Sequence, residues 1–164
     1  MCTEQKIWET LATINDPEIP VLSIIDLGIV RHVFCKKDET IEVVITPTYT
    51  GCPAMDVIVM QIRISLLALN AKHIVITTIL SPAWTTDWMS ELGKQKLKAY
   101  GITPPQIQKL AHHQNNLFTE TDSVSCPRCS SLNTKLISQF GSTVCKALYQ
   151  CEDCKEPFDY FKCH

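Results

Sequence analysis

The sequence predicts an α+β protein with a small mixed sheet of about three strands, helices in the order α-β-β-α-β-α, and a separate C-terminal module of β structure. Helical and strand-like hydrophobic periodicities alternate along the first hundred residues. Pro104 and Pro105 then interrupt the pattern, and six of the nine cysteines follow residue 125. A hydrophobic content of 45% with a net charge of -2 indicates a folded core rather than a disordered chain.

The first expected elements are a helix and a hairpin. Apolar residues recur at helical spacing from Ile7 to Ile14, and this helix should stop before Pro17, because proline disfavours helical backbone in the preceding residue. Residues 29–35 and 41–46 are rich in β-branched side chains and predict two strands. The polar residues 36–39 predict the turn between them.

A long helix, a third strand and a last helix should follow. Residues 53–70 predict the long helix, and the β-branched residues 74–80 predict a buried strand. Residues 85–87 offer N-cap side chains for a last helix that ends at Gly101, after a run of lysines.

The long helix also bears on assembly. Asp56, Arg63 and Asn70 form one narrow polar stripe, so most of its circumference is apolar and must be covered. One explanation is a homodimer contact, and the other is full cover by the protein's own first and last helices.

The change of composition after Gly101 predicts the domain organisation. Residues 1–101 form the α+β domain, and residues 102–123 form a polar linker with a short helix from Gln106 to His113. Residues 124–164 form the C-terminal module.

Charge and composition narrow the compartment and the partners. A pI of about 6.2 argues against nucleic acid. The N-terminal residues do not resemble a secretory signal, and the longest apolar run, residues 55–69, is broken by polar side chains, so no membrane partner is expected. We therefore expect a cytoplasmic protein with reduced thiols.

Two pairs of cysteines in the C-terminal module predict a metal site. Cys126 and Cys129 form one C-x2-C motif, and Cys151 and Cys154 form a second one, with 21 residues between the two motifs. Each motif can direct two sulfurs at one ion, and four thiolates favour one structural zinc ion per chain, with iron as the competitor. Strands at residues 135–140, 147–150 and 158–162 would complete a β zinc ribbon.

The module is too small to fold by apolar burial alone, which favours the structural interpretation. Bound zinc contributes about 10–16 kcal/mol to such modules. A redox dithiol suits this spacing less well, because two knuckles fit one ion better than one reversible bridge. A nucleic-acid ribbon lacks a basic face, since its lysines are balanced by acidic residues.

Three further potential ligands lie in the same module. Cys145, Cys163 and His164 could form a second, labile metal or cluster site. The alternative is that both cysteines simply pack as small apolar side chains.

Cys52 is the chemically interesting residue of the first domain. It lies between Thr50-Gly51 and Pro53, and proline fits the first position of the long helix, which would make Cys52 the N-cap. The helix dipole would favour a thiolate there. The alternative is an ordinary small capping residue.

Asp16 and Glu18 flank Pro17 in a turn that we expect to be exposed. They could act as oxygen ligands or partner contacts, or form only a solvated acidic turn. No nucleophile–base pair and no phosphate-binding glycine loop stands out, so we assign no catalytic residue and do not expect an autonomous enzyme.

These motifs resemble two known families. Residues 16–20, 26–30 and 46–53, with 81–88, resemble the iron–sulfur assembly domain family that includes SufT-type factors, over about residues 3–101. With residues 140–149 and 156–164 added, the whole chain resembles the PaaD family, whose members are components of the bacterial phenylacetyl-CoA epoxidase system, a multicomponent di-iron oxygenase fed by a flavin and iron–sulfur reductase.

The resemblance implies an accessory role with the oxygenase and reductase subunits as partners, and a domain that is often dimeric. It implies that Cys52 is reactive, that Asp16 and Glu18 belong to the acidic motif, and that iron or a nascent Fe-S cluster is held transiently. Thr50, beside Cys52, is a further candidate for handling the cluster. SufT-type factors generally lack the ribbon, so their mechanism does not extend to Cys145, Cys163 or His164. Two hypotheses follow: an assembly factor for metal centres, and a stoichiometric, non-catalytic oxygenase subunit that modulates partner or substrate binding.

Overall fold

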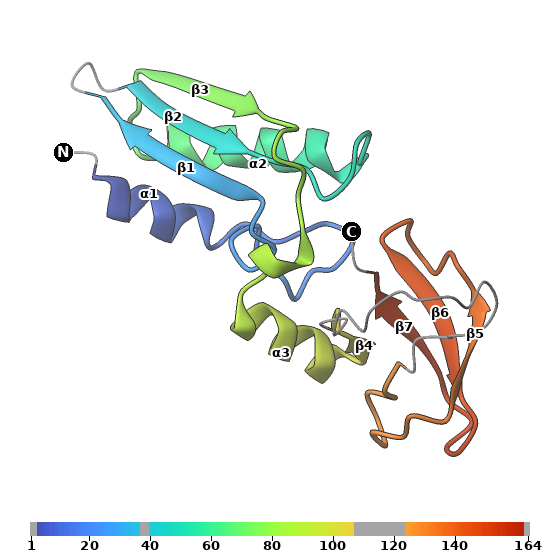
Figure 1. The fold of residues 1–164 in the computed structure, drawn as a ribbon. Helices are drawn as coiled ribbons and strands as arrows, with labels where there is room; N and C mark the ends of the chain where they lie inside the picture. The colour runs from blue at the N-terminus through green and yellow to red at the C-terminus, as the bar shows by residue number, and fades with distance from the viewer. Residues whose placement is uncertain (1–2, 37–39, 107–123, 163–164) are drawn as a thin grey trace. The chain divides into compact units, whose positions relative to one another are not determined.

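The computed structural model describes residues 3–36, 40–106 and 124–162 (Figure 1). They divide into two compact units, one within residues 1–96 and the other within residues 97–163. Among the helices that the structure describes, none combines the length and the apolar composition that a membrane span requires. The expected helix at 106–113 lies almost wholly outside the described residues, and the boundaries of the expected linker stay a prediction.

The first unit has the predicted mixed sheet. The sheet has three strands in the order β1-β2-β3, with β1 and β2 antiparallel and β2 and β3 parallel. The elements are α1 (Glu4–Leu11), β1 (Val30–Cys35), β2 (Thr40–Ile45), α2 (Ala54–Leu67), β3 (His73–Thr78), a single 3-10 turn (Thr86–Trp88) and α3 (Glu91–Tyr100), which crosses into the second unit. The α+β prediction is confirmed.

The core of this unit lies between the sheet and two helices. Alternate residues of β2 point inward and are buried, and α1 and α2 pack against that face (Figure 1). The helices contribute residues at four-residue spacing, as one buried face requires. The fully buried set includes Ile7, Leu11, Ile41, Val43, Ile45, Ile58, Ile62 and Leu66.

Two expectations about burial are wrong. The strand at 74–80 is not buried: β3 is an edge strand, and Val75 is 44% exposed because one face of the sheet is open. The chain's own helices also do not cover all of α2. Met60, Ile64 and Leu67 are each more than half exposed, on the side of α2 away from the core.

Asp26 connects the loop before β1 to the start of α3. Its buried carboxylate accepts hydrogen bonds from the backbone N–H and hydroxyl of Ser23 and from the Ser90 hydroxyl, and it pairs with Lys96 at 2.6 Å. Burial alone would raise the pKa of Asp26, but Lys96 and the serine donors together hold it below its usual value. The loop and the helix therefore share one ionised carboxylate.

The prediction that residues 85–87 cap the last helix is wrong. Residues 85–87 do not cap α3, because residues 86–88 form the 3-10 turn. Ser90 is the capping side chain, and its hydroxyl accepts the backbone N–H of Gly93 at 2.9 Å. The helix ends as expected before Gly101, whose φ of 92° suits a glycine after a helix.

The second unit is built on a four-stranded sheet in the order β4-β7-β6-β5. The strands are β4 (Ile102–Thr103), β5 (Thr134–Ser138), β6 (Lys146–Cys151) and β7 (Pro157–Phe161). The last three are antiparallel neighbours and match the strands expected for the ribbon. Two residues expected at the start of the linker form β4, which pairs in parallel with β7.

Gly28 provides a test of the packing beside α3. Its φ is 68°, and a Cβ there would lie 2.8 Å from the Cβ of Trp88 and closer still to the Trp88 carbonyl. Gly28→Ala should lower the free energy of unfolding by about 2–5 kcal/mol, combining left-handed strain with overpacking. The measurement is urea unfolding followed by tryptophan fluorescence, which reports this unit because Trp8, Trp84 and Trp88 all lie in it.

The matched control is Gly51→Ala. Gly51 also has a positive φ, of 82°, but a Cβ there meets nothing within 4 Å. The Gly51→Ala variant should lower the free energy of unfolding by only about 1–2 kcal/mol, which is the cost of left-handed backbone for an alanine. Equal losses for the two variants would contradict the packing argument.

Candidate metal centre

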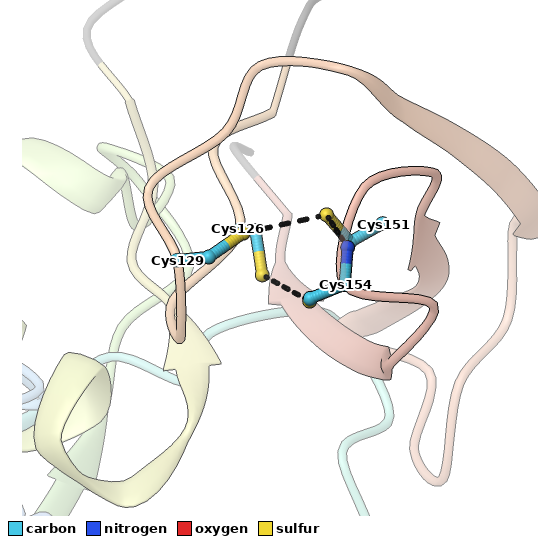
Figure 2. A group of neighbouring side chains, drawn as sticks. All are labelled: Cys126, Cys129, Cys151 and Cys154. Carbon is cyan, nitrogen blue, oxygen red and sulfur yellow. Dashed lines mark hydrogen bonds between the residues drawn. The ribbon is translucent and has the colours of Figure 1, made fainter.

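The four cysteines of the two C-x2-C motifs converge in the second unit (Figure 2). Their Sγ atoms all lie within 4.8 Å of one another, with Cys126 and Cys154 at 3.7 Å and Cys129 and Cys151 at 3.5 Å. Four sulfurs bound to zinc at about 2.3 Å in a tetrahedron lie about 3.8 Å apart. The separations fit one ion at the centre, so the residues fit a structural metal.

The backbone of the two motifs is alike. The residue after each second cysteine, Ser130 or Lys155, has a positive φ, of 61° and 63° respectively. The first cysteine's N–H donates to the carbonyl of Ser131 in one motif and of Glu156 in the other, at 2.9 and 3.0 Å. Each motif is therefore a tight turn, or knuckle, that one backbone hydrogen bond closes. The residue with left-handed backbone reverses the chain direction directly after the second cysteine.

Hydrogen bonds from one knuckle to the other support the cage. The carboxylate of Asp153, between Cys151 and Cys154, accepts from the Ser131 hydroxyl and from the Asn133 side-chain amide. These donors hold the pKa of Asp153 below its usual value, with the Ser131 hydroxyl as the main cause. No role was assigned to Asp153 from the sequence. Its position inside a C-x2-C motif was the one feature that could have indicated a role in supporting the cage.

A backbone donor also stabilises a thiolate inside the cage. The N–H of Cys154 lies 3.5 Å from the Sγ of Cys151, and this hydrogen bond is the main cause that lowers the pKa of Cys151 to about 7. Cys129 shows the opposite shift: the backbone N–H of Ser131 lowers its pKa, but the contact with the Cys151 sulfur and its other neighbours raises the pKa to about 12. Without a bound metal, the geometry therefore favours a thiolate at Cys151 and a thiol at Cys129.

The ligands are also part of the ribbon's small core. Cys126 and Cys151 are buried with Val124 and Phe158 in one apolar cluster, against which Tyr149 and Tyr160 pack. Cys129 and Cys154 lie on the exposed side. Since two ligands are core residues, metal binding and packing are coupled.

Cys145, the described one of the other ligand candidates, does not belong to this cage. Cys145 is 5% exposed, and its Sγ lies 3.0 Å from the Thr143 hydroxyl. Cys163 and His164 lie outside the described residues. The second labile site stays a prediction.

Cys52 is placed differently from the expectation. The helix begins at Ala54 with Pro53 in the N-cap position and without a side-chain capping bond, so the prediction that Cys52 is the N-cap is wrong. The tight turn is the reason: the Cys52 carbonyl accepts the N–H of Met55, and its own N–H donates to Tyr49. Cys52 is half-buried in this turn, next to exposed Thr50 and Gly51.

The acidic turn is not the exposed turn that was expected. Asp16 is only 8% exposed, and its Oδ1 accepts the backbone N–H groups of Glu18 and Ile19, each at 2.8 Å. This carboxylate shapes the turn, whereas Glu18 is half-buried. Among the described residues, the four ribbon cysteines are the group of possible ligands that meets, and Asp16, Glu18 and Cys52 do not join it.

Metal analysis of the full chain tests the cage. Protein purified without oxygen should hold one zinc ion per chain, and Cys126→Ser should lose the metal and the fold of the ribbon, because a structural site supplies most of a small module's stability. Elemental analysis and amide NMR spectra measure the two effects. The control, Cys145→Ser, should keep one zinc. Iron with visible charge-transfer bands in place of zinc would contradict the prediction.

Two family models match the chain. A model described as an iron–sulfur cluster assembly protein matches residues 4–75, which include Asp16, Glu18 and Cys52. A model described as the PaaD zinc beta ribbon domain matches residues 111–162, which include the four cage cysteines.

The chain is also similar to named proteins. It is 48% identical over 96% of its length and 92% of the relative to an Escherichia coli protein described as the D component of a "Putative 1,2-phenylacetyl-CoA epoxidase". It is 37% identical over 54% of its length to a Porphyromonas gingivalis "Fe-S protein maturation auxiliary factor", covering 85% of that protein. A Bacillus anthracis domain of unknown function, DUF59, aligns over 57% of this chain and 90% of that one, with a TM-score of 0.54 and 27% identity. The chain therefore belongs to the PaaD family, with an iron–sulfur cluster assembly domain followed by a zinc ribbon.

Proposed function

We propose that this protein is an accessory factor of the phenylacetyl-CoA epoxidase system that assembles or maintains the iron or iron–sulfur centres of the oxygenase or reductase subunits in the cytoplasm. The observation that carries the proposal is the position of Cys52. It lies in a turn beside exposed Thr50 and Gly51, in the domain that matches the iron–sulfur cluster assembly model. The similarity to a maturation factor over this domain supports the same role.

The backbone around Cys52 suits a transfer site. Gly51 has a φ of 82° and open space where a side chain would begin, so a partner can approach the backbone there. A thiolate is a soft ligand for iron and for clusters. In this proposal Cys52 holds the iron or cluster as cargo, while Asp16 fixes the backbone of its own turn through the N–H groups of Glu18 and Ile19.

The ribbon would bind the client protein. Its exposed apolar side chains include Leu132, Ile137, Phe140 and Val144, each at least 49% exposed. If these side chains form one contiguous patch, they would provide an interaction surface. The same surface suits the second candidate, a stoichiometric subunit that stays bound to the oxygenase and modulates partner or substrate binding.

Replacing Cys52 tests the assembly role. Cys52→Ser keeps the size of the side chain but removes the thiolate, so partner subunits produced with this variant should contain at least tenfold less iron and show correspondingly lower epoxidase turnover. Iron analysis and turnover of the purified partners measure the effect. The control is Cys35→Ser, a half-buried cysteine on β1, which should leave the partners fully metallated.

Two outcomes separate the candidates. Fully metallated, active partners made with Cys52→Ser would contradict the assembly role. If metallated partners still need an equimolar amount of this protein for turnover, the stoichiometric subunit is the correct function.

We further propose that two copies associate through the outer face of α2. Val57, Met60, Ile64 and Leu67 follow one another at helical spacing and are 38–60% exposed. Together they form an apolar stripe opposite the buried face, which a second copy of the same stripe would cover.

A charge on this stripe should separate the copies. Ile64→Glu should convert a dimer to a monomer in light scattering at micromolar concentration, because the dimer would bury an unpaired charge. Arg63→Glu adds the same side chain on the polar stripe and should leave the mass unchanged. A monomeric wild-type protein at all concentrations would contradict the proposal.

A further inference from the structure

A cavity lies beside the turn that carries Cys52. Its volume is about 230 Å³, and residues 46–50, Leu80, Ala83 and Trp84 line it. It opens at the exposed residues Thr50, Leu80 and Ala83. Small-molecule sites usually measure about 300–1,000 Å³, so this cavity suits a group smaller than a cofactor, with room for one side chain.

One residue that lines the cavity has an unpartnered hydroxyl. Thr46 is 1% exposed, and its Oγ1 has no hydrogen-bond partner among the described residues. The Thr46 N–H is satisfied by the carbonyl of Ile29 at 2.9 Å, so only the side chain lacks a partner. A buried hydroxyl without a partner costs about 1–3 kcal/mol, which an occupant of the cavity would recover. In the described conformation the Oγ1 is not accessible to a water-sized molecule, so an occupant would bond to it only after rotation about χ1 brings the hydroxyl toward the cavity.

The lining of the cavity defines the chemistry of that occupant. No described residue that lines it is charged at neutral pH, so an ionic group would be desolvated without a counter-charge. Thr48 and Thr50 add hydroxyl groups, and each hydroxyl can donate and accept. Leu80, Ala83 and Trp84 add apolar contact. A primary carboxamide on a short aliphatic stem matches this combination.

We propose that the cavity binds an asparagine or glutamine side chain of the client polypeptide, with the carboxamide on the Thr46 hydroxyl. Cys52 is two residues beyond Thr50, and two residues span at most about 7 Å. A polypeptide that approaches Cys52 can therefore place a neighbouring side chain in the cavity. The client part of this inference rests on the proposed function, but the carboxamide site itself does not.

Matched small probes test the chemistry of the site. In NMR titrations of the full chain, propionamide should shift the backbone amides of residues 46–50 and the indole N–H of Trp84 in a saturable way. Propionate and propylamine have the same size but carry a charge and should cause no such shifts. The proposal is overturned if either charged probe binds as well as propionamide. It is also overturned if propionamide causes no saturable shift up to about 0.5 M, which is on the order of the weakest binding that a fragment of this size shows.

The source of the carboxamide is tested with a blocked residue. N-acetylglutamine N-methylamide carries the same group on a polypeptide backbone and should bind more tightly than propionamide. Weaker binding of the blocked residue would overturn the assignment to a polypeptide and indicate a free amide as the ligand.

Thr46→Val tests the hydroxyl itself, because valine keeps the shape of threonine. The variant should bind propionamide roughly three- to tenfold more weakly, as expected for one lost hydrogen bond, without a lower melting temperature. The control, Thr77→Val on the exposed side of β3, should change neither property. The role of Thr46 is overturned if Thr46→Val binds propionamide as tightly as the wild-type protein does. It is also overturned if Thr46→Val lowers the melting temperature, because the hydroxyl would then serve the fold.

The carboxamide site is independent of the role of Cys52. Propionamide should bind Cys52→Ser and the wild-type protein equally. The carboxamide site therefore stands if the maturation assay fails, and the maturation role stands if the titrations fail.

Discussion

The second unit depends on bringing four sulfurs together around a shared positive charge. Within 4.8 Å of one another, four thiolates would repel strongly, and four protonated thiols would leave the knuckles without a metal to hold them. Two of these sulfurs belong to residues that are also buried in the apolar cluster of Val124 and Phe158. Coordination and core packing are therefore the same contacts, and the β-sheet of the unit extends from them.

In the first unit, the ionised carboxylate of Asp26 connects elements that are far apart in the sequence. Asp26 takes hydrogen bonds from the loop that precedes β1 and from the residue that caps α3, and Lys96 balances its charge. The adjacent Leu27 carbonyl accepts the indole N–H of Trp84 at 2.8 Å, which fixes one wall of the cavity beside the Cys52 turn. The geometry of the candidate site is thus set by residues far from it in the sequence.

Local patterns predicted the elements and the cage well, because C-x2-C spacing and β-branched runs specify geometry over a few residues. Tertiary context decided the rest. Whether the strand at 74–80 was buried depended on its place at the edge of the sheet. Ser90 rather than residues 85–87 caps α3 because the intervening residues form a separate turn. The Asp-Pro-Glu sequence did not show that the Asp16 carboxylate would be buried and would accept two backbone N–H groups. The unpartnered hydroxyl of Thr46 likewise had no signal in the sequence.

The bonds from Asp153 to the opposite knuckle have a kinetic consequence. A chelator must displace the thiolates one at a time, and each knuckle is held in position by the other through Ser131 and Asn133. A sulfur that is displaced first would therefore stay close to the ion, in a position to rebind. We expect this carboxylate, which lies outside the ligand set, to slow the exchange of the metal without any increase in the strength of the individual metal–sulfur bonds.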